Sequence, residues 1–323
     1  MKAIKPFAEI MDIDIGKDVL KKIEWIGRTC YKSTDKITDD SAEKFVAGLI
    51  KRGHEAMVEH ASFCFEVDYG VYCATKDTIK ILSDNYGFKS FIRFTNEDDR
   101  ILMSANVRAW RDLFEYMVEW CGIPVCFEGF IKENPVLFPE YQNGVFIQGH
   151  FGSIHPVYTD DLKTEREFLT HCDVTVRFVV DRGVTHEIVR HRPASFAQES
   201  TRYCNYAKDK FGGEITFIIP EFFKYGSPEW VLWKTAMEEC ENTYMTMMEL
   251  GVTPEKARSV LPNSLKTELI MTANCAEWVH FFGLRACNNT GKAHPQMLEV
   301  SRPLLDDFKK TISVVFDSLT YGE

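Results

Sequence analysis

Residues 173–203 read DVTVRFVVDRGVTHEIVRHRPASFAQESTRY and join a strand pattern to an unusually basic turn. Over 173–181 apolar residues alternate along the chain, which is typical of a strand that covers a core with one face. The residues of that face are Val174, Val176, Phe178 and Val180. Gly183 interrupts the alternation, and a short helical pattern then runs to Pro193, where proline ends it. The stretch therefore predicts a buried strand followed directly by a short helix.

Outward from this stretch, helical and extended patterns alternate irregularly. Capping residues and apolar spacing predict helices over 17–31, 41–52, 106–120, 228–251, 276–284 and 295–319, and another opening at 254. Pro303, a residue type that can kink a helix, lies inside the 295–319 segment. Strands are predicted over 61–67, 88–94, 100–104 and 267–273. We expect an α+β protein with a mostly antiparallel central sheet flanked by helices.

Basic and hydroxyl side chains are concentrated in the eighteen residues that end the quoted stretch. His186 and Arg190 share one helical face at a spacing of four, and Arg192 lies on another, so one turn can contact two anionic groups. Guanidinium groups bind phosphate oxygens in bidentate fashion, and Ser200 and Thr201 add further donors. The pattern favours a cradle for two phosphate-bearing ligands. A solvated basic face on a surface helix is the alternative.

The basic turn also carries a family signature. Arg190-His191-Arg192, followed after seven residues by Ser200, resembles the Arg-His-Arg-x7-Ser signature of the flavin-dependent thymidylate synthases. Further matching elements, in family order, are Gly53-His54-Glu55, Glu59-His60, Gln198-x-Ser200-x-Arg202-Tyr203, Ala257-Arg258, Val260-Leu261-Pro262, Asn274, Phe281-Phe282-x-Leu284-Arg285 and His294-Pro295-Gln296. The resemblance covers about residues 1–67 and 172–323.

The resemblance implies roles for individual residues. FAD would be held by Ser62, Arg190, His191, Arg192, Gln198, Asn274 and His280. The substrate dUMP would be held by Glu187, Arg190, Gln198, Ser200, Thr201, Arg202, Arg258 and Arg285. Arg285 is also the expected catalytic residue, because a cation beside a developing base anion in a dry site stabilises that anion far better than water does. An arginine that caps the last carbonyls of a helix is the alternative for Arg285.

Three positions depart from the family pattern. Glu187 stands where many members carry glutamine, and a carboxylate beside a phosphorylated pyrimidine is unfavourable unless it is protonated or paired. We expect such a pairing with His191 or Arg190 at helical spacing. Cys30 and His280 stand where relatives often carry serine and asparagine.

The activity that the resemblance implies is reductive methylation of dUMP to dTMP. In it, 5,10-methylenetetrahydrofolate supplies the carbon and NADPH supplies the reducing equivalents through bound FAD. The resemblance also implies a homotetramer with active sites shared between subunits. Residues 1–323 are expected to form a single domain of this family, interrupted by an insertion at about 68–171. That insertion would serve either as a lid at the folate or NADPH entrance or as an addition that thickens the oligomer surface.

Composition excludes several other classes of protein. Aromatic side chains that stack on bases and arginines that bind phosphates would suit a nucleic acid polymer. The net charge of -10 disfavours such a partner, because it repels a polyanion. No stretch is apolar enough for a membrane span and the start lacks a signal-peptide core, so we expect a cytoplasmic protein. The ten cysteines form no Cys-x-x-Cys pair and are expected to be reduced. No metal site is expected, because the two histidines of the basic turn are five residues apart and lack a ligand motif.

Overall fold

The long strand β9 (Asp173–Asp181) lies at the centre of the computed structural model, which describes residues 1–86, 91–97, 99–144, 146–149, 151–207 and 213–322. It belongs to a four-stranded antiparallel sheet with the order β10-β12-β9-β2, in which β10 is Ser195–Gln198, β12 is Lys266–Asn274 and β2 is Phe7–Asp12. Strands β9 and β12 pair along their whole length, with Asp173 opposite Asn274. The prediction of an α+β fold with mostly antiparallel strands is confirmed.

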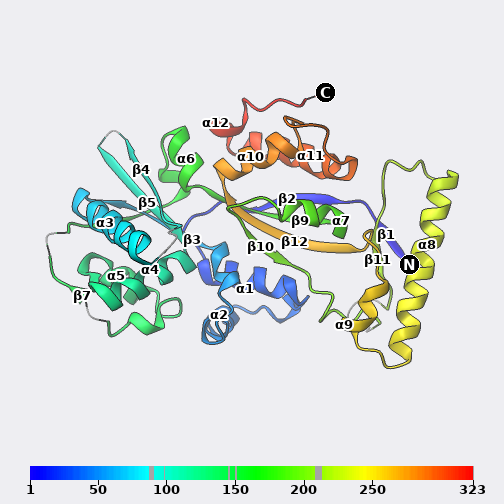
Figure 1. Cartoon of the computed structure of the whole chain (residues 1–323), viewed down its shortest axis with the longest axis horizontal. Coiled ribbons are helices and arrows are strands. Elements are labelled where there is room, and N and C mark those ends of the chain that lie inside the picture. The colour runs from blue at the N-terminus through cyan, green and yellow to red at the C-terminus, as the bar shows by residue number, and fades with distance from the viewer. Residues whose placement is uncertain (87–90, 98, 145, 150, 208–212, 323) are drawn as a thin grey trace.

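Helices cover both faces of this sheet (Figure 1). On one side lie α10 (Cys275–Arg285), α11 (Pro295–Thr311) and α12 (Ser313–Phe316), and on the other lie α1 (Val19–Cys30) and α2 (Ser41–Lys51). The four alternating apolar residues of β9 are fully buried in the core beneath α10 and α11, as their spacing predicts. The Trp278 indole of α10 donates to the Val174 carbonyl at 3.1 Å, which fixes the helix to the strand.

A second four-stranded antiparallel sheet has the order β4-β5-β3-β8. Its strands are β3 (Ser62–Val67), β4 (Arg93–Glu97), β5 (Arg100–Asn106) and β8 (Ile154–Val157). Around it lie α3 (Tyr69–Tyr86), α4 (Val107–Trp120) and α5 (Glu128–Glu133), in the left half of Figure 1. An aromatic cluster of Phe65, Trp110, Phe114 and Phe130 fills its core. Only β3 of this sheet comes from the chain before residue 68, so the segment expected as an insertion builds around an existing strand.

Smaller elements complete the chain. Strands β1 (Lys2–Ile4) and β11 (Thr216–Ile218) pair in parallel beside α8 (Pro228–Glu249) and α9 (Pro254–Ala257), at the right of Figure 1. Strands β6 (Ile123–Pro124) and β7 (Phe146–Ile147) form another parallel pair, and α6 (Glu165–His171) precedes β9. In the described part of the chain, 3-10 helices are formed by Thr34–Lys36, Glu55–His60, Val125–Phe127, Pro139–Tyr141, Thr159–Asp161 and Arg258–Val260. No helix in the described part of the chain is both long and apolar enough to cross a bilayer.

Several local predictions need correction. The final helix does not run to residue 319; it passes through Pro303, ends at Thr311 and is followed by α12. Leu304, Leu305 and Phe308 are fully buried directly after the proline, and their packing outweighs the hydrogen bond that proline removes. Helix α3 and strands β2 and β10 have no counterpart among the predicted elements. Residues 88–90 of the strand predicted over 88–94 lie outside the described residues, and β4 begins only at Arg93.

Candidate functional site

Helix α7 (Arg182–Ile188) links the strand end to the basic turn. The Asp181 side chain caps it by accepting from the Val184 backbone N–H at 2.7 Å. Five residues of an α-helix rise about 7.5 Å, so Arg182 at one end and Glu187 at the other face two separate regions. The site is accordingly built at the two ends of α7.

At the far end of α7, Arg285 joins two predicted site residues. Its Nη1 donates to Glu187 Oε2 at 2.7 Å, and its Nε donates to His191 Nε2 at 3.1 Å. The Ser301 hydroxyl donates to the Arg285 backbone carbonyl at 2.6 Å and so holds the end of α10. The pairing expected for Glu187 therefore exists, but its partner is Arg285 rather than His191 or Arg190. Sequence spacing along one helix cannot reveal a partner that lies 98 residues away.

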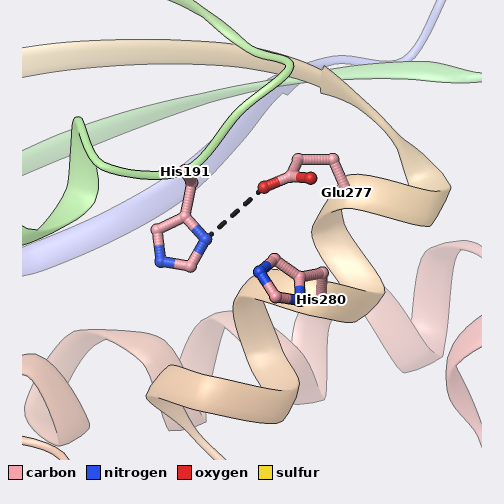
Figure 2. Close-up of side chains that lie close together, drawn as sticks. All are labelled: His191, Glu277 and His280. Carbon is pink, nitrogen blue, oxygen red and sulfur yellow. Dashed lines mark ion pairs between the residues drawn. The ribbon is translucent and has the colours of Figure 1, made fainter.

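His191 also faces helix α10 on its other side (Figure 2). Its Nδ1 lies 3.5 Å from Glu277 Oε1, and the His280 ring lies near both of these side chains. His191 and Glu277 are buried, whereas His280 is exposed. The structure thus places His280 and Arg285 next to His191 and adds Glu277 to this group.

At the near end of α7 lies a cavity of about 420 Å³. It is lined by Arg182, Thr201, Glu255, Arg258, Ser259, Leu261 and Leu265. Arg258 Nη1 contacts the Thr201 hydroxyl at 3.4 Å, so these two predicted substrate residues meet. The Nη1 atom of Arg182 is buried and has no hydrogen-bond partner among the described residues. A buried guanidinium nitrogen without a partner is costly, which favours an anion beside Arg182 even though Glu255 also lines this cavity.

Three further predicted arginines are exposed. Arg190, Arg192 and Arg202 form no ion pair with an acidic side chain of the described residues. Ser200 makes two hydrogen bonds near these arginines. Its backbone N–H donates to the Cys30 carbonyl at 3.0 Å, and its hydroxyl accepts from the Arg202 backbone N–H at 3.3 Å. Unpaired guanidinium groups in a chain of net charge -10 are expected to attract anions locally.

The remaining predicted residues are engaged in the protein interior. The Ser62 hydroxyl donates to the Asp173 carboxylate, and Asp173 is the strand partner of Asn274. The Asn274 side chain caps α10 by accepting from the Glu277 N–H at 3.0 Å. Gln198 donates to the Thr185 hydroxyl of α7 at 3.0 Å. The roles assigned to these residues stay predictions.

Arg182 and Glu277 are site residues that the sequence analysis did not single out. Arg182 stands directly between the buried strand and the basic turn, so its position in the decisive stretch is a signal that could have identified it. Glu277 lies three residues after Asn274 and three before His280, on the same helical face, and that spacing is also visible in the sequence.

Together, fold and site define an α+β protein with a polybasic site at the end of an antiparallel sheet. The chain belongs to the family described as Thymidylate synthase complementing protein, whose profile matches residues 13–76 and 163–312. It is 40% identical to the flavin-dependent thymidylate synthase of Pyrococcus furiosus over 129 aligned residues. This alignment covers 40% of this chain and 51% of that protein. The enzyme of the same name from Geobacter sulfurreducens is 37% identical over 108 residues, or 33% of this chain and 45% of its own.

The chain thus spans about half the length of the curated relatives it matches. A structural likeness extends to a UMP/dUMP methylase from Streptomyces cacaoi, solved bound with 5-Br dUMP. That likeness has a TM-score of 0.43 and 15% identity, and covers 100% of this chain and 98% of the other. It is too distant to bear on the assignment.

Proposed function

We propose that this protein is a flavin-dependent thymidylate synthase that methylates dUMP to dTMP. In this proposal 5,10-methylenetetrahydrofolate donates the carbon and NADPH donates the reducing equivalents. Family membership supports it, and so does one observation: Arg285 is held between Glu187 and His191, at the opposite end of α7 from the cavity that contains Arg182 and Arg258. The site therefore offers a cation for a base and separate cations for a phosphate.

The proposal places the nucleotide in one orientation. A dianionic phosphate in the cavity would satisfy the unpartnered Arg182 and the Arg258 guanidinium, with the Thr201 hydroxyl as a further donor. The base would then extend along α7 toward Arg285. There the guanidinium group would stabilise negative charge on the pyrimidine, while Glu187 keeps the arginine in place. Gln198 contacts Thr185 of α7, and Ser200 directly precedes Thr201 in the chain.

The residues present also fit FAD. His191 Nδ1 is buried without a hydrogen-bond partner among the described residues, and Arg190 and Arg192 have no acidic partner there. These three groups can receive the ring and pyrophosphate of a flavin dinucleotide, with the exposed His280 ring beside them. When bound, FAD would supply hydride transfer from NADPH to the one-carbon unit that becomes the methyl group of the nucleotide.

The cysteines are consistent with a reaction that uses no thiol nucleophile. Burial raises the pKa of Cys30 to about 11 and that of Cys64 to about 12, so both thiols are protonated at neutral pH. Cys30 is the cysteine whose backbone contacts Ser200. A protonated thiol is a poor nucleophile, and attack on the base by Cys30 is not part of the proposal.

The proposal extends to the organisation of the protein. We infer that residues 1–323 act as one domain with an insertion at about 68–171, that four copies share active sites, and that the protein works in the cytoplasm. These statements rest on the family resemblance.

Absorption spectroscopy on the full chain tests the function. The purified protein, supplied with FAD, should show flavin absorption that NADPH bleaches without air and that air restores. With dUMP and methylenetetrahydrofolate it should then form dTMP, with UMP as the comparison substrate. A protein that takes up no FAD and forms no dTMP contradicts the proposal.

Replacing Arg182 tests the phosphate subsite. Arg182→Met keeps the apolar stem but removes the guanidinium group, so we expect the Kd for dUMP to rise roughly 10- to 100-fold, because one hydrogen bond to a charged group contributes about 1.5–3 kcal/mol. Binding is measured by calorimetry, with the exposed Arg52→Met as matched control. Unchanged affinity in Arg182→Met would remove Arg182 from the subsite.

A further inference from the structure

His191, Glu277 and His280 form a cluster of potential metal ligands (Figure 2). One nitrogen from each histidine and one carboxylate oxygen all lie within 4.8 Å of one another. His191 and Glu277 are only 3% and 7% exposed, so both side chains are more than nine-tenths buried. Glu277 and His280 are one helical turn apart on α10 and project toward the histidine of the basic turn.

The two buried atoms at the centre of this cluster are unsatisfied. His191 Nδ1 and Glu277 Oε1 lie 3.5 Å apart, at ion-pair distance, and neither atom makes a hydrogen bond with any described residue. Buried polar atoms without partners are rare in folded proteins and cost about 1–3 kcal/mol each. Their shared position therefore points to a ligand that both contact.

We propose that His191, Glu277 and His280 bind one divalent transition-metal ion of the zinc class. Imidazole nitrogen and carboxylate oxygen are ordinary ligands of Zn²⁺, and two histidines with one carboxylate leave a further position open. Ligands that lie about 2 Å from such an ion are roughly 3.3 Å apart, close to the spacing of Nδ1 and Oε1. The exposed His280 ring can rotate to close the remaining distance, and its exposure gives the ion a path from solvent.

Proton positions couple this site to Arg285. In the metal-free protein His191 Nε2 accepts from Arg285 Nε at 3.1 Å, so the proton of a neutral imidazole lies on Nδ1. Metal binding needs the Nδ1 lone pair, and the proton therefore moves to Nε2. Arg285 Nε can then no longer donate to His191, although Arg285 keeps its contact with Glu187. The loss of this hydrogen bond opposes metal binding, so Arg285→Ala should bind the metal at least as tightly as the unmodified chain.

Flavin and metal should exclude one another. This part of the inference rests on the proposed function, because His191 and His280 are also the residues expected to face FAD. The metal would then act as an inhibitor of flavin uptake rather than as a cofactor.

Titration of the full chain with Co²⁺, followed by displacement with Zn²⁺, tests the site. The chain is first stripped of flavin and metal, in a Cys121→Ser background because Cys121 is an exposed thiol. We expect one Co²⁺ per chain, with visible bands of nitrogen and oxygen ligation and no thiolate charge-transfer band. His280→Ala should weaken binding roughly 100-fold or more, since even the loss of an outer-shell partner costs 10- to 100-fold. Glu277→Gln should weaken it as well.

His186→Ala is the matched control, because His186 is an exposed histidine on the neighbouring α7 and is expected to leave binding unchanged. No uptake of Co²⁺, or equal affinity in His280→Ala and the parent, overturns the metal site. FAD uptake should fall as Zn²⁺ rises and recover with chelator; full FAD uptake by zinc-loaded protein overturns the exclusion. A chain that binds metal but never takes up FAD, even with chelator, counts against the proposed function alone.

Discussion

Replacing Arg285 by alanine is expected to lower the rate of dTMP formation roughly 100- to 1,000-fold, the loss typical when one preorganised donor to a developing anion is removed. Arg285 donates to both Glu187 and His191, so its position is fixed before any substrate binds. Because Arg190 and Arg192 are unaffected by this change, bound flavin should be largely retained. The measurement combines single-turnover dTMP formation with the flavin absorbance of the same sample.

Arg285→Lys separates the positive charge from the guanidinium geometry. Lysine keeps one charge but cannot donate to Glu187 and His191 together, so an intermediate rate is expected. A folded, flavin-bound Arg285→Ala variant with unimpaired turnover would show that Arg285 is only the helix-end arginine considered above. Loss of flavin together with activity would assign Arg285 a structural role instead.

The parts of the fold that follow local rules could be predicted from the sequence. The alternation over 173–181 predicts a strand, and the capping residues Ser227 and Asn106 predict the starts of two helices. The ends of all three elements agree with the structure to within a few residues. Prediction from local pattern fails for helix α3. Val71 and Leu82 are among the few apolar residues that this helix buries, so its sequence shows only a weak helical spacing of apolar residues. Strand β10 is only four residues long, and it is defined by pairing with β12 about 70 residues away.

The candidate site divides in the same way. The composition of the basic turn reveals it in the sequence, but its partners come from α10, about a hundred residues further along the chain. The pairing of Glu187 with Arg285, and the approach of Glu277 and His280 to His191, depend on how α10 packs over the sheet. No metal site is expected from the sequence because only ligands close together in the chain can be compared with known metal motifs. The cluster of His191, Glu277 and His280 joins residues far apart in the chain, so sequence spacing could not reveal it.

A second long-range interaction fastens the two sheets together. Arg93 of β4 donates twice to Asp173 of β9, at 2.6 and 2.8 Å, and the Ser62 hydroxyl of β3 donates to the same carboxylate. Burial alone would raise the pKa of Asp173, but the Arg93 charge and these hydrogen bonds outweigh it and hold that pKa below its ordinary value. The segment expected as an insertion therefore supplies the cation that contributes most to keeping Asp173 ionised in the interior.

Arg93→Met is accordingly expected to lower the free energy of unfolding by about 3–5 kcal/mol at neutral pH, because it leaves a buried carboxylate without its partner. Urea unfolding measures this, and Arg166→Met is the matched control, since Arg166 is a largely exposed arginine paired with Glu97 and should contribute at most about 1 kcal/mol. The sign of the pH dependence of this stability difference is fixed as well. The depressed pKa of Asp173 contributes stability that is present above the ordinary aspartate pKa of about 3.9. That stability is lost as pH falls through the pKa of Asp173 in the folded protein. The difference between the parent and Arg93→Met should therefore shrink in acid, and adding Asp173→Asn should recover part of it at neutral pH. A difference that stays constant from pH 7 to acid would show that Arg93 acts through packing and not through the charge of Asp173.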